Sequence, residues 1–187
     1  MAIRIVGISG SLRQGSFNTA LLRAAADVAP AGVTIDVRTI HGIPLYDADV
    51  ENGPGIPEAV TRLKDEIASS NGLLLVTPEY NNSIPGVFKN AIDWLSRPDA
   101  DIARVFRGRP VAIMGASPGR FGTTLSQSAW LPVIRTLGMR PWLDERMLLF
   151  EARKMFDPSG TLTDTQTRER MVKFVHGYCS FVTSNAR

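Results

Sequence analysis

The chain has 187 residues, of which 44% are hydrophobic and 21% charged, and this composition predicts one globular domain over residues 1–187 with a full apolar core. The formal net charge of +3, without any Lys/Arg run, argues against a nucleic-acid-binding protein and favours a small anionic ligand. A single cysteine excludes a disulfide framework or a multi-cysteine metal site, and without a signal peptide or a membrane-spanning apolar stretch we expect a cytoplasmic protein.

The first predicted strand, Ile3 to Ile8, runs into a polar loop and then into a helical pattern from Phe17 to Val28. Free N–H groups and the helix dipole favour an anion at such a helix start, and the hydroxyls and the arginine of the loop suit a phosphate. The glycine spacing matches neither G-x-G-x-x-G nor a nucleoside-triphosphate P-loop, so we expect a phosphate monoester. The alternative is that Ser16 or Asn18 only caps the helix.

Four further strands are predicted. Residues 33–37 alternate between apolar and polar, which is typical of a half-exposed strand at a sheet edge. Residues 73–76 and 111–114 are unbroken apolar runs, as expected for strands covered on both faces. A fifth strand is predicted within Trp142 to Leu149, with Pro141 tolerated at its start on an edge.

Helical spacing of apolar residues around 56–67 and 171–182 predicts helices that pack on this sheet. The Pro/Gly-rich segment 41–55 and the Arg/Asp-rich segment 96–110 are predicted to be surface connections. The alternation of strands and helices predicts an α/β three-layer sandwich, with five parallel strands in the order 2-1-3-4-5.

In an open sheet of this order, a ligand lies beyond the carboxyl ends of the strands, between the first and third strands along the chain. The loop at 77–86 is rich in Pro and Asn, so we expect a fixed irregular backbone whose polar groups read the edge of a heterocycle, with Tyr80 as a flat surface. Glycines at 115–122 are expected to let a planar ring approach the backbone closely.

The residues Gly115 to Gly119 also match the G-x-S-x-G nucleophile elbow of serine hydrolases. The oxyanion hole of an elbow uses the N–H of the residue after the serine, and Pro118 has none. His41 and His176 are predicted to be structural or surface residues, and two lone histidines do not favour a zinc site. We therefore expect neither a catalytic serine nor a bound metal.

The chain resembles the NADPH-dependent FMN reductase family, close to its quinone and chromate reductase members. The resemblance rests on three motifs that each end a predicted strand: residues 10–18, residues 78–94 with Pro-Glu-Tyr-Asn at their start, and residues 116–119. It spans nearly the whole chain and weakens after Leu149. It implies a flavodoxin-like fold, bound FMN and a homodimer or homotetramer.

By this resemblance, one loop holds the FMN phosphate, a second contacts the ring system and a third contacts its pyrimidine side. The predicted cofactor-binding residues of these three loops are Ser11, Leu12, Arg13, Gln14, Gly15, Ser16, Phe17 and Asn18, then Pro78, Glu79, Tyr80 and Asn81, then Ser117 and Gly119. N–H groups around 117–123 are expected to stabilise negative charge on the pyrimidine side. Residues 89–94 are expected to serve helix packing or a subunit interface, with Lys89 and Asp93 as an i, i+4 pair.

The implied activity is hydride transfer from NAD(P)H through FMN to a small-molecule acceptor such as a quinone, a flavin, an azo compound or chromate. No side chain is predicted to be catalytic, because the flavin carries the redox chemistry. The alternative is a flavodoxin-type electron carrier that does not oxidise NAD(P)H. Flavodoxins are typically acidic, whereas this chain is basic.

Overall fold

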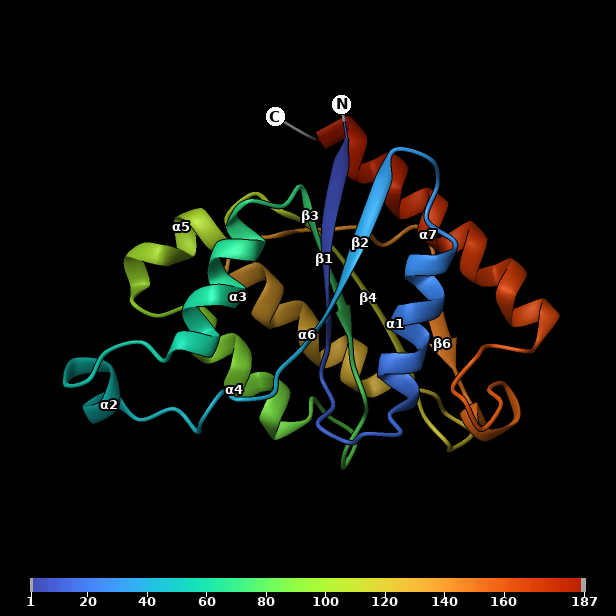
Figure 1. Cartoon of the computed structure of the whole chain (residues 1–187), viewed down its shortest axis with the longest axis horizontal. Coiled ribbons are helices and arrows are strands. Elements are labelled where there is room, and N and C mark those ends of the chain that lie inside the picture. Colours follow the sequence, from blue (N-terminus) through green and yellow to red (C-terminus); the bar gives the residue numbers. More distant parts are fainter. Residues whose placement is uncertain (1, 186–187) are drawn as a thin grey trace.

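Six parallel strands form one sheet in the computed structural model, which describes residues 2–185 (Figure 1). The order β2-β1-β3-β4-β5 confirms the predicted topology, and a sixth strand, β6, also pairs with β4. In sheet order the strands are β2 (Val33–Thr39), β1 (Ile3–Ser9), β3 (Gly72–Val76), β4 (Pro110–Ala116) and β5 (Arg140–Pro141), followed by β6 (Met147–Leu149).

The predicted fifth strand is divided into two short strands. β5 pairs with the start of β4, β6 pairs with its end, and the chain between them leaves the sheet. Pro141 is tolerated in β5 because the N–H groups that bond to the neighbouring chain are those of Arg140 and Trp142, which donate to the carbonyls of Arg109 and Val111 at 2.9 and 2.8 Å. Trp142 then turns into the core and packs edge-on against Phe174, with 5.1 Å between the ring centroids. The edge of the sheet therefore contains one strand more than the sequence predicted.

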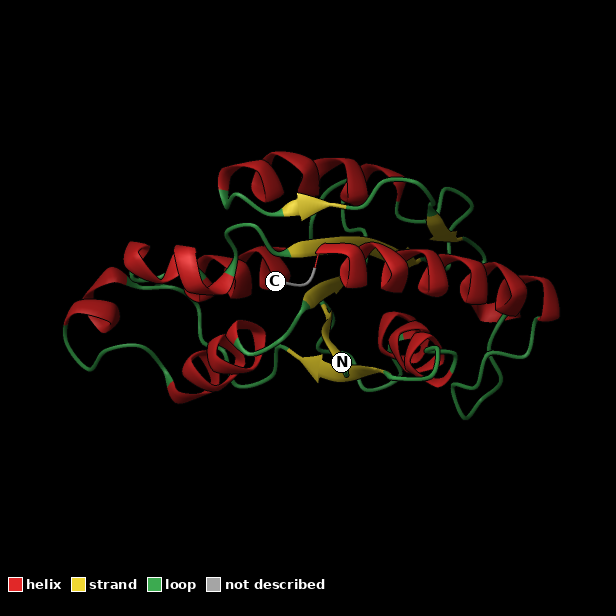
Figure 2. Cartoon of the chain, turned by 90° about the horizontal axis from the view of Figure 1, so that it is seen from above, coloured by secondary structure: helices red, strands yellow, loops and turns green. Residues whose placement is uncertain are grey.

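Helices cover both faces of the sheet (Figure 2). One core cluster packs α1 (Phe17–Asp27) and α7 (Thr165–Asn185) on the sheet, and the other packs α3 (Glu58–Ala68), α4 (Gly86–Leu95) and α6 (Thr124–Thr136). β3 and nearly all of β4 are buried, while the edge strand β2 is mostly half-buried, as their sequence patterns predicted. The flavodoxin-like three-layer architecture is thereby confirmed.

Both predicted surface connections contain short helices. The first includes α2 (Ala48–Asn52), and the second includes η1 (Asp99–Asp101) and α5 (Ile102–Val105). The first connection is tied to α4, because the carbonyl of Pro44 accepts from Trp94 Nε1 at 3.0 Å and from Asn90 Nδ2 at 2.8 Å. On the same helix, Lys89 Nζ lies 2.6 Å from Asp93 Oδ1, as the spacing predicted.

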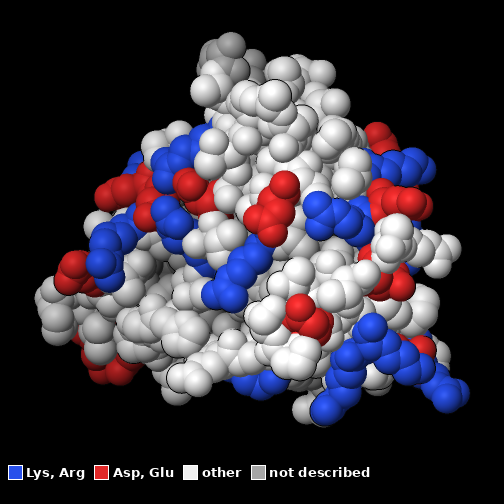
Figure 3. Space-filling view, turned by 45° about the vertical axis from the view of Figure 1, so that its right-hand side comes forward, with Lys and Arg blue, Asp and Glu red and all other residues white. Residues whose placement is uncertain are grey.

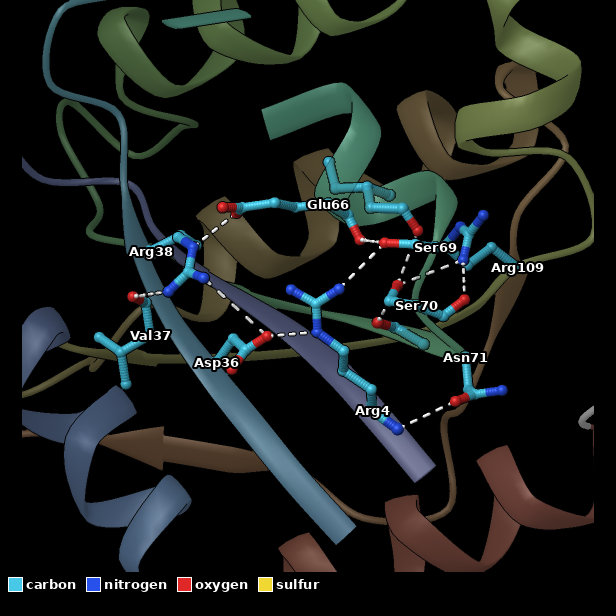
Figure 4. A network of polar contacts seen from close by, with 11 residues as sticks. Arg4, Asp36, Val37, Arg38, Glu66, Ser69, Ser70, Asn71 and Arg109 are labelled. Carbon is cyan, nitrogen blue, oxygen red and sulfur yellow. Dashed lines mark hydrogen bonds and ion pairs between the residues drawn. The ribbon is translucent and has the colours of Figure 1, made fainter. Parts of the chain in front are cut away.

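A polar network connects the edge strand to the rest of the domain (Figure 4). Arg4 on β1 donates to Asp36 on β2 at 2.6 Å, and Arg38 on β2 donates to Glu66 on α3 at 2.5 Å. Nearby, the half-buried guanidinium of Arg109 donates to backbone carbonyls at the end of α3 and in α5, and burial lowers its pKa. These contacts join β2, β1 and the α3–α5 layer.

Candidate flavin site

A cavity of about 320 Å³ opens where β1, β3 and β4 end. β1 lies between β2 and β3 in the sheet, so the cavity occupies the predicted point where the strand order reverses. Most predicted cofactor-binding residues line it: Ser11, Arg13, Ser16, Phe17, Asn18, Pro78, Glu79, Tyr80 and Ser117. Ala116 and Pro118, which belong to the third motif, and Arg153, which the sequence did not indicate, complete its wall.

The remaining predicted residues lie beside the cavity without lining it: Leu12, Gln14, Gly15, Asn81 and Gly119. Asn81 and Asn82 both have positive φ, 50° and 61°, at the tip of a two-residue turn closed by hydrogen bonds between Tyr80 and Ser83 at 3.2 and 3.1 Å. Asn tolerates this left-handed backbone better than most residues, which explains the two adjacent asparagines. The turn holds Tyr80 at the rim.

The α1 end of the cavity presents hydrogen-bond donors and positive charge. Ser11 and Ser16 line it, and both residues are buried. Ser16 also caps α1 by accepting from Thr19 N at 3.3 Å, so the capping alternative is correct for this residue without excluding a ligand role. The first turn of α1 has no acidic residue, and the guanidinium of Arg13 lies 5.2 Å from the Phe17 ring centroid. This end suits an anion.

Basic side chains also gather at the lower edge of the molecule in Figure 3, which is the edge where the strands end. Basic side chains at this edge of the molecule attract anions.

Asn18 makes a contact that its local sequence does not indicate. Its Nδ2 donates to the Ala116 carbonyl at 2.9 Å, and its Oδ1 accepts from the Ala116 N–H at 2.9 Å. Both atoms of a buried amide therefore join the start of α1 to the end of β4. The predicted phosphate contact of Asn18 stays a prediction, and its principal visible role is to align two walls of the cavity.

Glu79 also joins two loops. Its Oε2 accepts from the backbone N–H groups of Leu125 and Ser126 in the first turn of α6, at 2.8 and 2.9 Å. These two amides lie just after the N–H groups of residues 117–123, which we expected to face a ligand, and they bind the Glu79 carboxylate because a carboxylate pairs well with the positive end of the helix dipole. The expected role of the N–H groups at 120–123 stays a prediction. Farther back in the same segment, Ser117 N donates to the Leu149 carbonyl at 2.9 Å and is also occupied.

Gly115 differs from its predicted role. A Cβ atom at this position would lie 2.3 Å from the Thr77 carbonyl oxygen and 2.3 Å from Thr123 Oγ1. The space beside this glycine is therefore filled by β3 and by the start of α6 rather than by an approaching ring.

The serine, histidine and cysteine contacts do not form a nucleophilic site. Ser117 Oγ accepts from Gly119 N at 3.1 Å, while His41 Nε2 bonds to the carbonyl of Leu12 at 3.0 Å and His176 Nε2 contacts a carbonyl at the end of α1. Burial raises the pKa of the Cys179 thiol to about 11, which leaves it protonated at neutral pH.

Residues 2–185 contain no group of three His, Cys, Asp or Glu side chains that could hold a metal ion. Among the helices of the same residues, none has the length and apolar content that a membrane span requires.

Comparison with known proteins identifies the family. A model of the NADPH-dependent FMN reductase family matches residues 3–150. The chain belongs to the NADPH-dependent FMN reductase family. This membership confirms the predicted resemblance and places the chain among flavin-dependent oxidoreductases.

Relatives of this FMN reductase family member span nearly its full length. It is 44% identical over 167 residues to the NAD(P)H-dependent FMN reductase of Pseudomonas aeruginosa, covering 89% of this chain and 88% of that protein. It is 38% identical over 182 residues to the 2-hydroxy-1,4-benzoquinone reductase of a Burkholderia species, covering 97% of each chain. The solved structure of the flavoenzyme NAD(P)H:(acceptor) oxidoreductase FerB from Paracoccus denitrificans superposes with a TM-score of 0.86 at 31% identity, over 99% of this chain and 100% of that one.

Proposed function

We propose that this protein is an FMN-dependent NAD(P)H oxidoreductase that reduces small-molecule acceptors such as quinones, flavins, azo compounds or chromate. One observation carries the proposal: a single cavity is lined both by the buried Ser11 and Ser16 with Arg13 and by the Pro78–Tyr80 and Ser117–Pro118 turns. A phosphate monoester attached to a planar heterocycle combines an anionic group with a flat ring in one molecule, and this lining suits both. The names of the relatives support the same activity.

The residues present fit FMN. The cavity volume of about 320 Å³ is within the usual range for small-molecule sites, and the anion-favouring start of α1 opens on it. The loop between β1 and α1 lacks the glycine spacing of a dinucleotide site, which favours FMN over FAD. In the proposed arrangement Ser11, Arg13 and Ser16 hold the phosphate.

When bound, FMN would supply the two-electron redox chemistry between NAD(P)H and the acceptor. The protein supplies orientation. The Tyr80–Ser83 turn fixes one wall of the ring end, and the hydrogen bonds from Ser117 to Leu149 and from Gly119 to Ser117 fix another. Tyr80 is exposed at the rim, so the mouth beside it is open to NAD(P)H and the acceptor in turn.

We extend the proposal to a cytoplasmic homodimer or homotetramer, as the family resemblance implies. Large apolar side chains that lie exposed on the loops after the strands and in the first turn of α6 support self-association: Leu12, Tyr80, Phe121, Leu125 and Phe150.

We expect the protein to purify yellow, to release FMN rather than FAD in mild acid, and to lose its visible flavin absorption rapidly when mixed anaerobically with NADPH. Chromatography of the released flavin and stopped-flow absorption measure these outcomes. Parallel mixing with NADH gives the nucleotide preference. A flavin that NADPH and NADH do not bleach would support a flavodoxin-type carrier, and FAD or no flavin after reconstitution would contradict the proposed cofactor.

Arg13→Ala is expected to raise the dissociation constant for FMN roughly 10- to 150-fold, because a hydrogen bond to a charged group contributes about 1.5 to 3 kcal/mol. Exposure of Arg13 favours the lower end of this range. The dissociation constant of Arg13→Lys should lie between those of wild type and Arg13→Ala, since lysine keeps the charge without the planar guanidinium. Turnover at saturating FMN should stay within about threefold of wild type, a change in the barrier of less than about 1 kcal/mol.

Titration of the apoprotein with FMN, followed by flavin fluorescence, measures these affinities. Arg23→Ala is the control, because Arg23 is an exposed arginine of α1 that does not line the cavity. Equal FMN affinity in Arg13→Ala and Arg23→Ala would remove Arg13 from the site.

A further inference from the structure

Arg153 lines the cavity although it lies beyond residue 150, where the family match ends. It belongs to the short helix η2 (Ala152–Lys154), which follows β6. No sequence signal singles it out, because the motif resemblance weakens after Leu149 and the Arg153-Lys154 pair matches no binding motif.

The segment that carries Arg153 is anchored to two of the predicted cofactor-binding loops. Glu151 N donates to the Gly119 carbonyl at 2.9 Å, and Ala152 N donates to the Ser117 carbonyl at 3.1 Å. A few residues later, Phe156 stacks on Phe17 at the start of α1, with 5.9 Å between the ring centroids and 25° between the ring planes. Contacts before and after Arg153 thus hold its backbone between the loop at residues 117–119 and the start of α1.

The charge of Arg153 has no acidic partner among the described residues. The adjacent Lys154 pairs with Glu151, with Nζ 2.8 Å from Oε1, whereas neither Arg153 nor Arg13 lies within 4.0 Å of a carboxylate in residues 2–185. Glu79 is the acidic residue of the cavity lining, and the amides of α6 already occupy its carboxylate. The cavity therefore has two uncompensated guanidinium groups.

We propose that Arg153 is a second phosphate-binding arginine, which together with Arg13 binds the 5′-phosphate of FMN. A phosphate monoester carries about 1.5 to 2 negative charges near neutral pH. The start of α1 contributes about half a positive charge and Arg13 one more, which matches only the lower value, so a second arginine compensates the dianionic form as well and leaves the site slightly positive. FMN is the source of this phosphate because Arg153 shares one cavity with Ser11, Ser16 and Arg13. The inference rests on the proposed function.

The experiment compares Arg153→Ala with Lys154→Ala by titrating each apoprotein with FMN and with riboflavin, which is the same heterocycle without the phosphate. Arg153→Ala should raise the dissociation constant for FMN roughly 5- to 30-fold and change that for riboflavin less than about twofold, because the lost contact is to the phosphate of an exposed site. Lys154→Ala removes a neighbouring charge that is already paired and should change neither value. Arg153 is exposed, so the thermal unfolding of both apoproteins should match that of wild type.

The other outcomes overturn the inference in distinct ways. Equal weakening of FMN and riboflavin binding would mean that Arg153 acts through loop packing. Unchanged FMN affinity with a higher KM for NADPH, but not for NADH, would assign the arginine to the 2′-phosphate of the nucleotide. Unchanged values throughout would remove it from the site. Failure of the wild-type apoprotein to bind FMN would instead overturn the proposed function, and with it this inference.

Discussion

Gly115→Ala is expected to destabilise the protein by about 3 kcal/mol, the upper end of the usual range for overpacking. The new Cβ would lie 2.3 Å from the Thr77 carbonyl oxygen and 2.3 Å from Thr123 Oγ1, and Thr77 and Thr123 are both fully buried. A backbone carbonyl in the neighbouring strand cannot rotate away as a side chain can. Relief requires β3 and β4 to separate where they carry two walls of the cavity, so FMN affinity should fall as well. Urea unfolding of the apoprotein measures the loss.

Two other glycines give graded controls. At Gly7 in β1 the added Cβ would lie 2.4 Å from Leu22 Cδ1, the end of a flexible side chain, so the loss should be smaller than at Gly115. At Gly86, the first residue of α4, no heavy atom lies within 4 Å, and alanine should be neutral or stabilise by up to about 1 kcal/mol by restricting the unfolded chain. Equal unfolding midpoints for Gly115→Ala and Gly86→Ala would contradict the steric argument.

Asn18→Ala is expected to lower the free energy of unfolding by about 2 to 4 kcal/mol. The substitution leaves the N–H and the carbonyl of Ala116 without their partners, and a buried unsatisfied group costs about 1 to 3 kcal/mol. FMN affinity should also fall, because the start of α1 would no longer be aligned with the end of β4. Chemical unfolding of the apoprotein measures the stability, and titration with riboflavin tests alignment without the phosphate.

Asn90→Ala is the matched control. The Asn90 amide makes the same pair of contacts, accepting from Tyr46 N at 2.8 Å and donating to the Pro44 carbonyl at 2.8 Å, but it is only half-buried. Water can replace both partners there, so the expected loss is below about 1 kcal/mol. If Asn18→Ala were no more destabilising than Asn90→Ala, burial of the hydrogen bonds between Asn18 and Ala116 would not explain their contribution to the stability of the protein.

The sequence by itself determined the strands and main helices, their order in the sheet and the edge at which a ligand binds. Each of these follows from local pattern. Unbroken apolar runs mark strands covered on both faces, alternation marks the edge strand, and the order 2-1-3-4-5 places the loops after β1, β3 and β4 together. The Ser/Arg loop before α1 and the Pro-Glu-Tyr-Asn turn were recognisable because turn and capping chemistry depends on neighbouring residues.

Only the tertiary structure decided which polar groups are engaged by other parts of the chain. The amide of Asn18 contacts Ala116 across 98 positions, and the carboxylate of Glu79 contacts the start of α6 across 46 and 47 positions. The same holds for the filled space beside Gly115, the division of the last edge strand, and the presence of Arg153 in the cavity wall. Such contacts depend on which separate elements lie close together in space. A local sequence pattern carries no information about that proximity.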